Sequence, residues 1–158
     1  RISHVWREAQ NMVAYLAKGD SLQFGNGVVR AVGSVTGIKL PSGLVMRYED
    51  LKGAQGEKGV EYTYQTRKGR TRLYGGKVIE NVCQAVARCI IGEQMLLIAK
   101  KYPPVLTVHD SIVACVPEKE VEEAQTYIEG CMRYVPTWAE GLPLDCESGV
   151  AKSYGDCE

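Results

Sequence analysis

The stretch that decides the fold is Leu106-Thr107-Val108-His109-Asp110-Ser111-Ile112-Val113-Ala114-Cys115. Two apolar, β-branched runs flank Asp110-Ser111, and this pattern predicts an antiparallel hairpin with those two residues as its turn. Strand alternation would place Asp110 on the sheet face of Val108 and His109 on the opposite face. A carboxylate at a hairpin tip beside a histidine can hold a divalent metal, but Asp-Ser is also ordinary turn chemistry. These residues alone leave both interpretations open.

Length and composition indicate one globular domain. The chain has 158 residues, of which 45% are hydrophobic and 24% charged, and 19 basic residues balance 19 acidic ones. A formal net charge of zero argues against a purely electrostatic nucleic-acid binder but leaves local basic patches possible. One such patch comprises Arg67, Lys68, Arg70, Arg72 and Lys77.

Six cysteines and two histidines give little support to a zinc site, because no two cysteines have the CxxC spacing. Most of the cysteines lie in apolar runs, so we expect small buried hydrophobic side chains in a reducing cytosol. No apolar stretch approaches the roughly 20 residues that span a bilayer. The chain opens on Arg1, as expected of a processed chain or of a fragment.

Periodicity predicts an α+β fold. Helices are expected at 2–17, at 77–101, where a wide apolar stripe predicts a largely buried helix, and at 118–134. Residues 20–74 predict a β meander, with strands at 28–32, 44–48 and 61–66 and a mobile glycine-rich loop at 52–59. A last strand is expected at 142–146. Tight turns imply an antiparallel sheet with helices on one face, and the other face, carrying Asp110, would be open to a ligand.

Several motifs resemble family A DNA polymerases, the group of bacterial polymerase I and many phage replicative enzymes. The run 106–110, Leu-Thr-Val-His-Asp, is similar to the third conserved motif of that family. The longer run 73–88, Leu-Tyr-Gly-Gly-Lys-Val-Ile-Glu-Asn-Val-Cys-Gln-Ala-Val-Ala-Arg, resembles the helix that precedes this motif in phage members. Residues 40–48 and 141–155 resemble the flanking turn and the C-terminal strand. The resemblance covers most of the chain in the right order.

The resemblance implies the C-terminal part of a polymerase palm, with the hairpin carrying a catalytic aspartate beside long helices. Residues 1–158 would form one domain: a helix that follows the fingers at 1–19, a β-meander insertion at 20–74 and the palm core at 75–158. Nucleotidyl transfer to a primer–template from a dNTP would use two Mg²⁺ ions. The enzyme would act in the cytoplasm of a bacterial or phage-infected cell.

The resemblance also implies residue roles. Asp110 matches the metal-binding catalytic aspartate, His109 the histidine that supports the primer terminus, and Gln84 a glutamine that checks the minor groove. Lys77, Arg72 and Arg70 would contact DNA phosphates. Ser111 stands where the family usually has glutamate and is a candidate for the second shell of the metal site.

No segment matches the family's first catalytic aspartate or its fingers helix, so we expect the chain alone to be inactive. The rest of the polymerase, with fingers, thumb and first aspartate, would complete the site. Three alternatives remain: a non-catalytic module that binds DNA or a replication protein, one subunit of a split polymerase, and an unrelated metal-dependent hydrolase built on His109 and Asp110. The hydrolase ranks last because such sites usually need more ligands.

Overall fold

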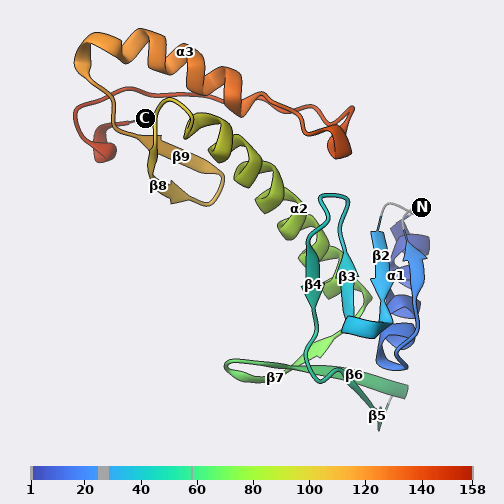
Figure 1. Cartoon of the computed structure of the whole chain (residues 1–158). Helices are drawn as coiled ribbons and strands as arrows, with labels where there is room; N and C mark the ends of the chain where they lie inside the picture. The colour runs from blue at the N-terminus through green and yellow to red at the C-terminus, as the bar shows by residue number, and fades with distance from the viewer. Residues whose placement is uncertain (1, 25–28, 58, 158) are drawn as a thin grey trace. The chain divides into compact units, whose positions relative to one another are not determined.

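The structure is a computed structural model that describes residues 2–24, 29–57 and 59–157. It confirms an α+β chain with antiparallel strands (Figure 1). Contacts divide the chain into two compact units, Arg1–Val86 and Ala87–Glu158, and each is described by itself. The division into a helix, an insertion and a palm core stays a prediction.

The first unit begins with helix α1 (Ile2–Ala17), as predicted. Its side chains Ala9, Met12, Val13 and Leu16 are buried, and the helix packs against strands β1 and β2 (Figure 1). Gly19, with a φ of 81°, follows the helix in the left-handed conformation that commonly ends helices.

Seven short strands follow α1 in the described part of this unit. They are β1 (Leu22–Phe24), β2 (Val29–Val32), β3 (Gly37–Lys39), β4 (Val45–Arg47), β5 (Lys52–Gly56), β6 (Gly59–Thr66) and β7 (Gly69–Leu73). A 3₁₀ turn, η1 (Gly33–Val35), joins β2 to β3. The predicted meander is confirmed, but it forms two sheets, β1-β2-β3-β4 and β5-β6-β7, separate from the later hairpin. The expectation of one sheet was therefore wrong.

The glycine-rich stretch 52–59 was expected to be a mobile loop, and this was also wrong. Residues 52–56 form β5, which pairs with β6 from Lys52↔Thr63 to Gly56↔Gly59, while residue 58 lies outside the described residues. A Cβ at Gly53 would lie 3.0 Å from the Tyr62 ring. The absence of a side chain at Gly53 thus leaves room for this tyrosine.

Helix α2 (Gly75–Ile98) begins in direct contact with α1. The Gly75 backbone N–H donates to Gln10 Oε1 at 2.8 Å, and a Cβ at Gly75 would lie 2.6 Å from the Trp6 carbonyl oxygen. Six residues later, Asn81 Nδ2 donates to the hydroxyl of buried Tyr48 at 3.2 Å. Burial raises the pKa of this Tyr48 hydroxyl above its ordinary value. Gly75, the first glycine of the Tyr-Gly-Gly-Lys motif, therefore has a packing role.

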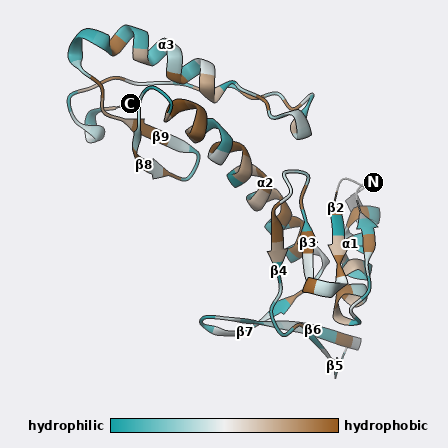
Figure 2. Ribbon diagram, in the orientation of Figure 1, coloured by the Kyte–Doolittle hydropathy of each residue, from teal (hydrophilic) through white to brown (hydrophobic). Residues whose placement is uncertain are grey.

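The second unit holds the end of α2, strands β8 (Pro104–Val108) and β9 (Ser111–Ala114), and helix α3 (Val121–Met132). It also holds short 3₁₀ turns, which are η2 (Glu118–Glu120), η3 (Thr137–Ala139) and η4 (Tyr154–Asp156). Ile98, Tyr102 and Ala124 form its buried cluster. In Figure 2 the end of α2 is hydrophobic, whereas α3 is mostly hydrophilic.

Helix α2 is less buried than its apolar stripe predicts. Ile90, Ile91 and Ile98 are buried, but Cys83, Gln84, Ala87 and Arg88 are exposed and Leu96 is 70% exposed. The cysteines likewise depart from expectation, because none is buried. Cys83, Cys115 and Cys157 are exposed, the other three are half-buried, and none forms a disulfide. The cysteine side chains are therefore not part of the core, although most of them lie in apolar runs of the sequence.

Side chains of α2 fix the end of α3. Gln94 is 2% exposed, and its Nε2 donates to the carbonyl oxygens of Met132 at 2.5 Å and Tyr134 at 3.2 Å. These carbonyls lie where a helix ends without intrahelical partners. Trp138 Nε1 adds a hydrogen bond to Glu93 Oε1 at 2.6 Å. The last turn of α3 and the chain after it are thus anchored to α2.

The strand expected at 142–146 is absent, since these residues are irregular. Arg133 holds them, donating from Nε to Asp145 Oδ1 at 2.8 Å and from Nη2 to the Cys146 carbonyl at 3.3 Å. Glu129 accepts from Arg133 Nη1 at 3.0 Å and from the Ser148 hydroxyl. We call Glu129, Arg133, Asp145 and Ser148 the Arg133 clasp. The hydrogen bonds of these side chains hold the segment in place of the backbone hydrogen bonds that a strand would form.

Within the described residues, no helix combines the length and the apolar character needed to cross a membrane.

Replacing Gly75 by alanine is expected to destabilise the first unit by about 1–3 kcal/mol, because the new methyl group would overlap the α1 backbone. Gly92→Ala is the matched control, since it lies in the same helix and a Cβ there meets no atom within 4 Å. This control is expected to be neutral or stabilising by up to about 1 kcal/mol. Urea unfolding would compare the two, and equal stabilities would contradict the packing role.

The Arg133 clasp is expected to loosen in acid. Hydrogen bonds from Arg133 hold the pKa of the Asp145 carboxyl below its ordinary 3.8, and those from Ser148 and Arg133 hold that of Glu129 below 4.5. A carboxyl whose pKa is lowered in the folded state stabilises the attachment of residues 142–149 when the pH is above its ordinary pKa. This stabilisation is lost as the pH falls through the lowered pKa. NMR shifts of residues 142–149 would follow the loss from about pH 4.5 downward. If the Arg133→Gln variant showed the same pH dependence as the wild type, the role of Arg133 in the clasp would be contradicted.

Candidate functional site

The β8–β9 hairpin carries the candidate metal ligand. Its register pairs Val108 with Ser111, so its two-residue loop is His109-Asp110, one residue earlier than predicted. His109 has a φ of 54°, and a positive φ at the first loop position is what primed hairpin turns require. Strand alternation ends at Val108. The expected assignment of Asp110 and His109 to opposite sheet faces was therefore wrong, because both lie in the loop.

Asp110 is exposed, and its carboxylate forms no ion pair or side-chain hydrogen bond with another described residue. A free carboxylate is the type of oxygen ligand that Mg²⁺ prefers, so Asp110 fits such an ion as one ligand. The described part of the chain contains no group of three or more His, Cys, Asp or Glu side chains that could hold a metal. A complete metal site would need ligands from elsewhere.

The strand that leads to this loop exposes apolar side chains. Val105 is 60% exposed and Leu106 44% exposed, while Val108 is 37% exposed. The hairpin is two-stranded in the described chain, with a register irregularity between Pro104 and Leu106. These exposed side chains belong to the strand, whereas Asp110 lies in the loop, so the expectation of an open face that carries Asp110 stays a prediction.

Gln84 and Lys77 lie on α2 in the first unit, whereas the hairpin belongs to the second. Gln84 is exposed. Lys77 Nζ lies 2.7 Å from Glu80 Oε1, and this hydrogen bond raises the pKa of the Lys77 amine above its ordinary value. Lys77 and Gln84 lie about two turns apart on one helix, and Lys77 already has a carboxylate partner.

Arg70 is a structural tie on β7. It donates from Nη1 to Asp50 Oδ2 at 2.7 Å, from Nη2 to the carbonyls of Asp50 and Thr63 at 2.9 Å, and from Nε to Thr63 Oγ1 at 3.1 Å. Asp50 has a φ of 50°, a conformation that non-glycine residues rarely adopt. Hydrogen bonds from Lys52 and Arg70 lower the pKa of the Asp50 carboxyl. Sequence reasoning missed the structural role of Asp50.

Arg72 lies two residues further along β7 and forms an ion pair with Glu61. The hydrogen bond to Glu61 raises the pKa of the Arg72 guanidinium. Three of the cations that the sequence assigns to DNA, Arg70, Arg72 and Lys77, thus have carboxylate partners within the first unit.

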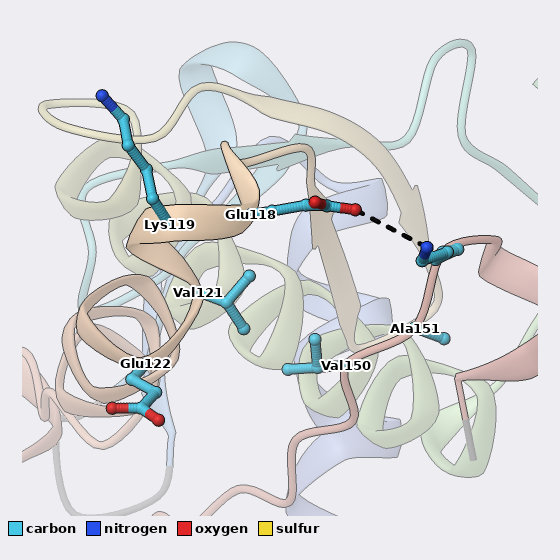
Figure 3. Close-up of a pocket in the computed structure, with 7 residues that line it drawn as sticks. Glu118, Lys119, Val121, Glu122, Val150 and Ala151 are labelled. Atoms are coloured by element: carbon cyan, nitrogen blue, oxygen red, sulfur yellow. Dashed lines mark ion pairs between the residues drawn. The ribbon is translucent and has the colours of Figure 1, made fainter.

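The second unit also contains a hollow. It has a volume of about 630 Å³ and opens between η2, the start of α3 and residues 150–152 (Figure 3). Glu118 and Lys152 pair across it, with 3.7 Å between Oε1 and Nζ. None of the predicted site residues lines it.

Comparison with known proteins places these features in context. A DNA polymerase of Bacillus phage SP02 is 34% identical to this chain over an alignment of 125 residues that covers 74% of the chain. The chain is related to a DNA polymerase. It spans only 19% of the length of that relative. No family model matches the chain, and no solved structure matches it.

Arg70→Gln is expected to lower the midpoint of thermal unfolding of the first unit by a few degrees, because four hydrogen bonds to Asp50 and Thr63 are lost. Arg72→Gln is the matched control on the same strand and removes one exposed ion pair, a contact of little net value. Calorimetry of both variants would test this. An equal midpoint for the two would contradict the structural role of Arg70.

Proposed function

We propose that this chain is the C-terminal part of the palm of a family A DNA polymerase and takes part in template-directed DNA synthesis. The observation that carries the proposal is the free, exposed carboxylate of Asp110 in the hairpin loop, within a chain related to a phage DNA polymerase. The motifs at 73–88 and 106–110 give additional support. Residues 75–158 would form the palm core.

Asp110 would hold Mg²⁺. When bound, paired Mg²⁺ ions activate the primer 3′-hydroxyl and neutralise the charge that develops on the departing pyrophosphate of a dNTP. The loop gives Asp110 the exposure that ligation requires, since no described side chain occupies its oxygens. Ser111 begins β9 directly after it and would orient water near the ion rather than add negative charge.

His109 and Gln84 would contact the primer–template. His109 is exposed beside Asp110 in the loop and would support the primer terminus. Gln84 is exposed on α2, where its amide could donate to the minor-groove acceptors that every correct base pair presents. Such contacts check the geometry of a base pair without reading its sequence.

Lys77, Arg70 and Arg72 would contact phosphates only after exchanging protein carboxylates for them. Lys77 would leave Glu80, and Arg72 would leave Glu61. Arg70 would give up its bonds to Asp50, which makes it the weakest of the three candidates. An exchange of one charged partner for another reduces the net gain in affinity relative to an unpaired cation.

The rest of the polymerase would supply what these residues lack. The chain spans 19% of its phage relative, and the first catalytic aspartate, fingers and thumb would come from the remainder of the enzyme. We propose that residues 1–158 alone are inactive, because a single carboxylate does not assemble a two-metal site. The enzyme would act in the cytoplasm of a bacterial or infected cell.

The decisive test replaces Asp110 by asparagine in the complete natural polypeptide that carries these residues. Primer extension is expected to fall by roughly a thousandfold, since several kcal/mol of metal-dependent transition-state stabilisation are lost. Fluorescence anisotropy should find primer–template affinity nearly unchanged, because the phosphate contacts remain.

Asp156→Asn is the control, since it neutralises an exposed aspartate in η4. It is expected to leave extension unchanged. Extension by Asp110→Asn at the wild-type rate would refute the proposed metal ligand. Wild-type polypeptide that binds DNA without extending a primer would instead favour a binding module.

A further inference from the structure

The outward face of the β1-β2-β3-β4 sheet carries three cations on three adjacent strands. Arg30 on β2 lies directly opposite Lys39 on β3, so the two share a face. Gly37 and Lys39 alternate onto that same face of β3, and Gly37 lies opposite Arg47 on β4. All three charged side chains are exposed. We call Arg30, Lys39 and Arg47 the basic triad.

The opposite face of this sheet is the buried one, which fixes the direction of the triad. Ala31 and Ile38 face each other across β2 and β3, and both are fully buried. The residues that alternate with Ala31 and Ile38 along each strand therefore point away from the core. The sequence pattern of short β-prone runs gave no sign that three cations from separate strands would gather here.

Among the described residues, no carboxylate forms an ion pair with the basic triad. The described strand residues on this face are Gln23, Arg30, Val32, Gly37, Lys39, Val45 and Arg47, and none is acidic. None of the three cations forms an ion pair or side-chain hydrogen bond with another described residue. Like charges directly opposite each other, with side-chain origins about 5 Å apart, destabilise a sheet. A bound polyanion would convert this repulsion into attraction.

We infer that the basic triad binds the phosphate backbone of DNA, and this inference rests on the proposed role in DNA synthesis. A small anion would be held in a concave pocket, whereas this surface is an open sheet face. An extended chain of phosphates can contact cations on three adjacent strands at once. Unlike Arg72 and Lys77, the triad has no ion-pair partner among the described residues to lose when it neutralises phosphates. Its contacts are independent of base sequence, as a polymerase requires.

The test measures how DNA affinity depends on salt in the complete natural polypeptide. The variant is Arg30→Gln with Lys39→Gln, and the probe is a labelled duplex primer–template without dNTP. The control is Arg7→Gln with Lys18→Gln, which removes the same two residue types from exposed positions in the first unit that form no ion pair with another described residue. The slope of log affinity against log salt should become shallower by about 2 in the variant, one for each lost phosphate contact. It should stay unchanged in the control.

A second variant separates lost binding from lost folding. Lys39→Glu places opposite charges across β2 and β3, so its midpoint of thermal unfolding should rise while DNA binding weakens. A lower midpoint would overturn the argument from like-charge repulsion. An unchanged salt slope in the Gln variant, or an equal loss in the control, would overturn the DNA contact. The proposed function survives the failure of the triad if the wild type still extends primers and Asp110→Asn does not. A wild type that binds no DNA overturns both the triad and the proposed function.

Discussion

The first unit depends on how closely α2 begins beside α1. At Gly75 the α1 backbone occupies the space that any other side chain would need, and the Gly75 N–H completes the contact through Gln10. Because a helix is a regular rod, this contact positions the residues that follow on α2 within the first unit. Gln84 lies nine residues along, or about 14 Å at 1.5 Å per residue. The motif that resembles a polymerase helix therefore contains both its anchor and its candidate DNA contact.

The second unit is held together at its edges by polar side chains. Gln94 donates to the carbonyls of Met132 at the end of α3 and of Tyr134 just after it, and the Arg133 clasp attaches the irregular segment after residue 141. Gln94 is buried and has defined partners, so its hydrogen bonds exclude alternative ends for α3. The clasp is exposed, and its charge pairs are individually weak in water. The buried hydrogen bonds of Gln94 are therefore stronger than the solvent-exposed charge pairs of the clasp.

Local patterns predicted the elements better than their assembly. Apolar spacing located α1, and residues 40–48, expected from the resemblance to contain a turn, do turn at Gly43, which has a φ of 89° and donates its N–H to the Leu40 carbonyl at 2.9 Å. The hairpin was predicted, but its loop was displaced by one residue. Asp-Ser has strong turn chemistry, yet the observed ladder ends at Ser111 and gives the positive φ to His109. Cross-strand pairing, which depends on distant residues, decided the register.

The exposed apolar row on β8 has a consequence for the solubility of residues 1–158. In the described chain β8 pairs only with β9, so its other edge presents unpaired backbone groups next to Val105 and Leu106. Such an edge is a template for strand addition by a second molecule, and Pro104 blunts only its beginning. Residues 1–158 prepared alone would therefore self-associate through β8 as their concentration rises.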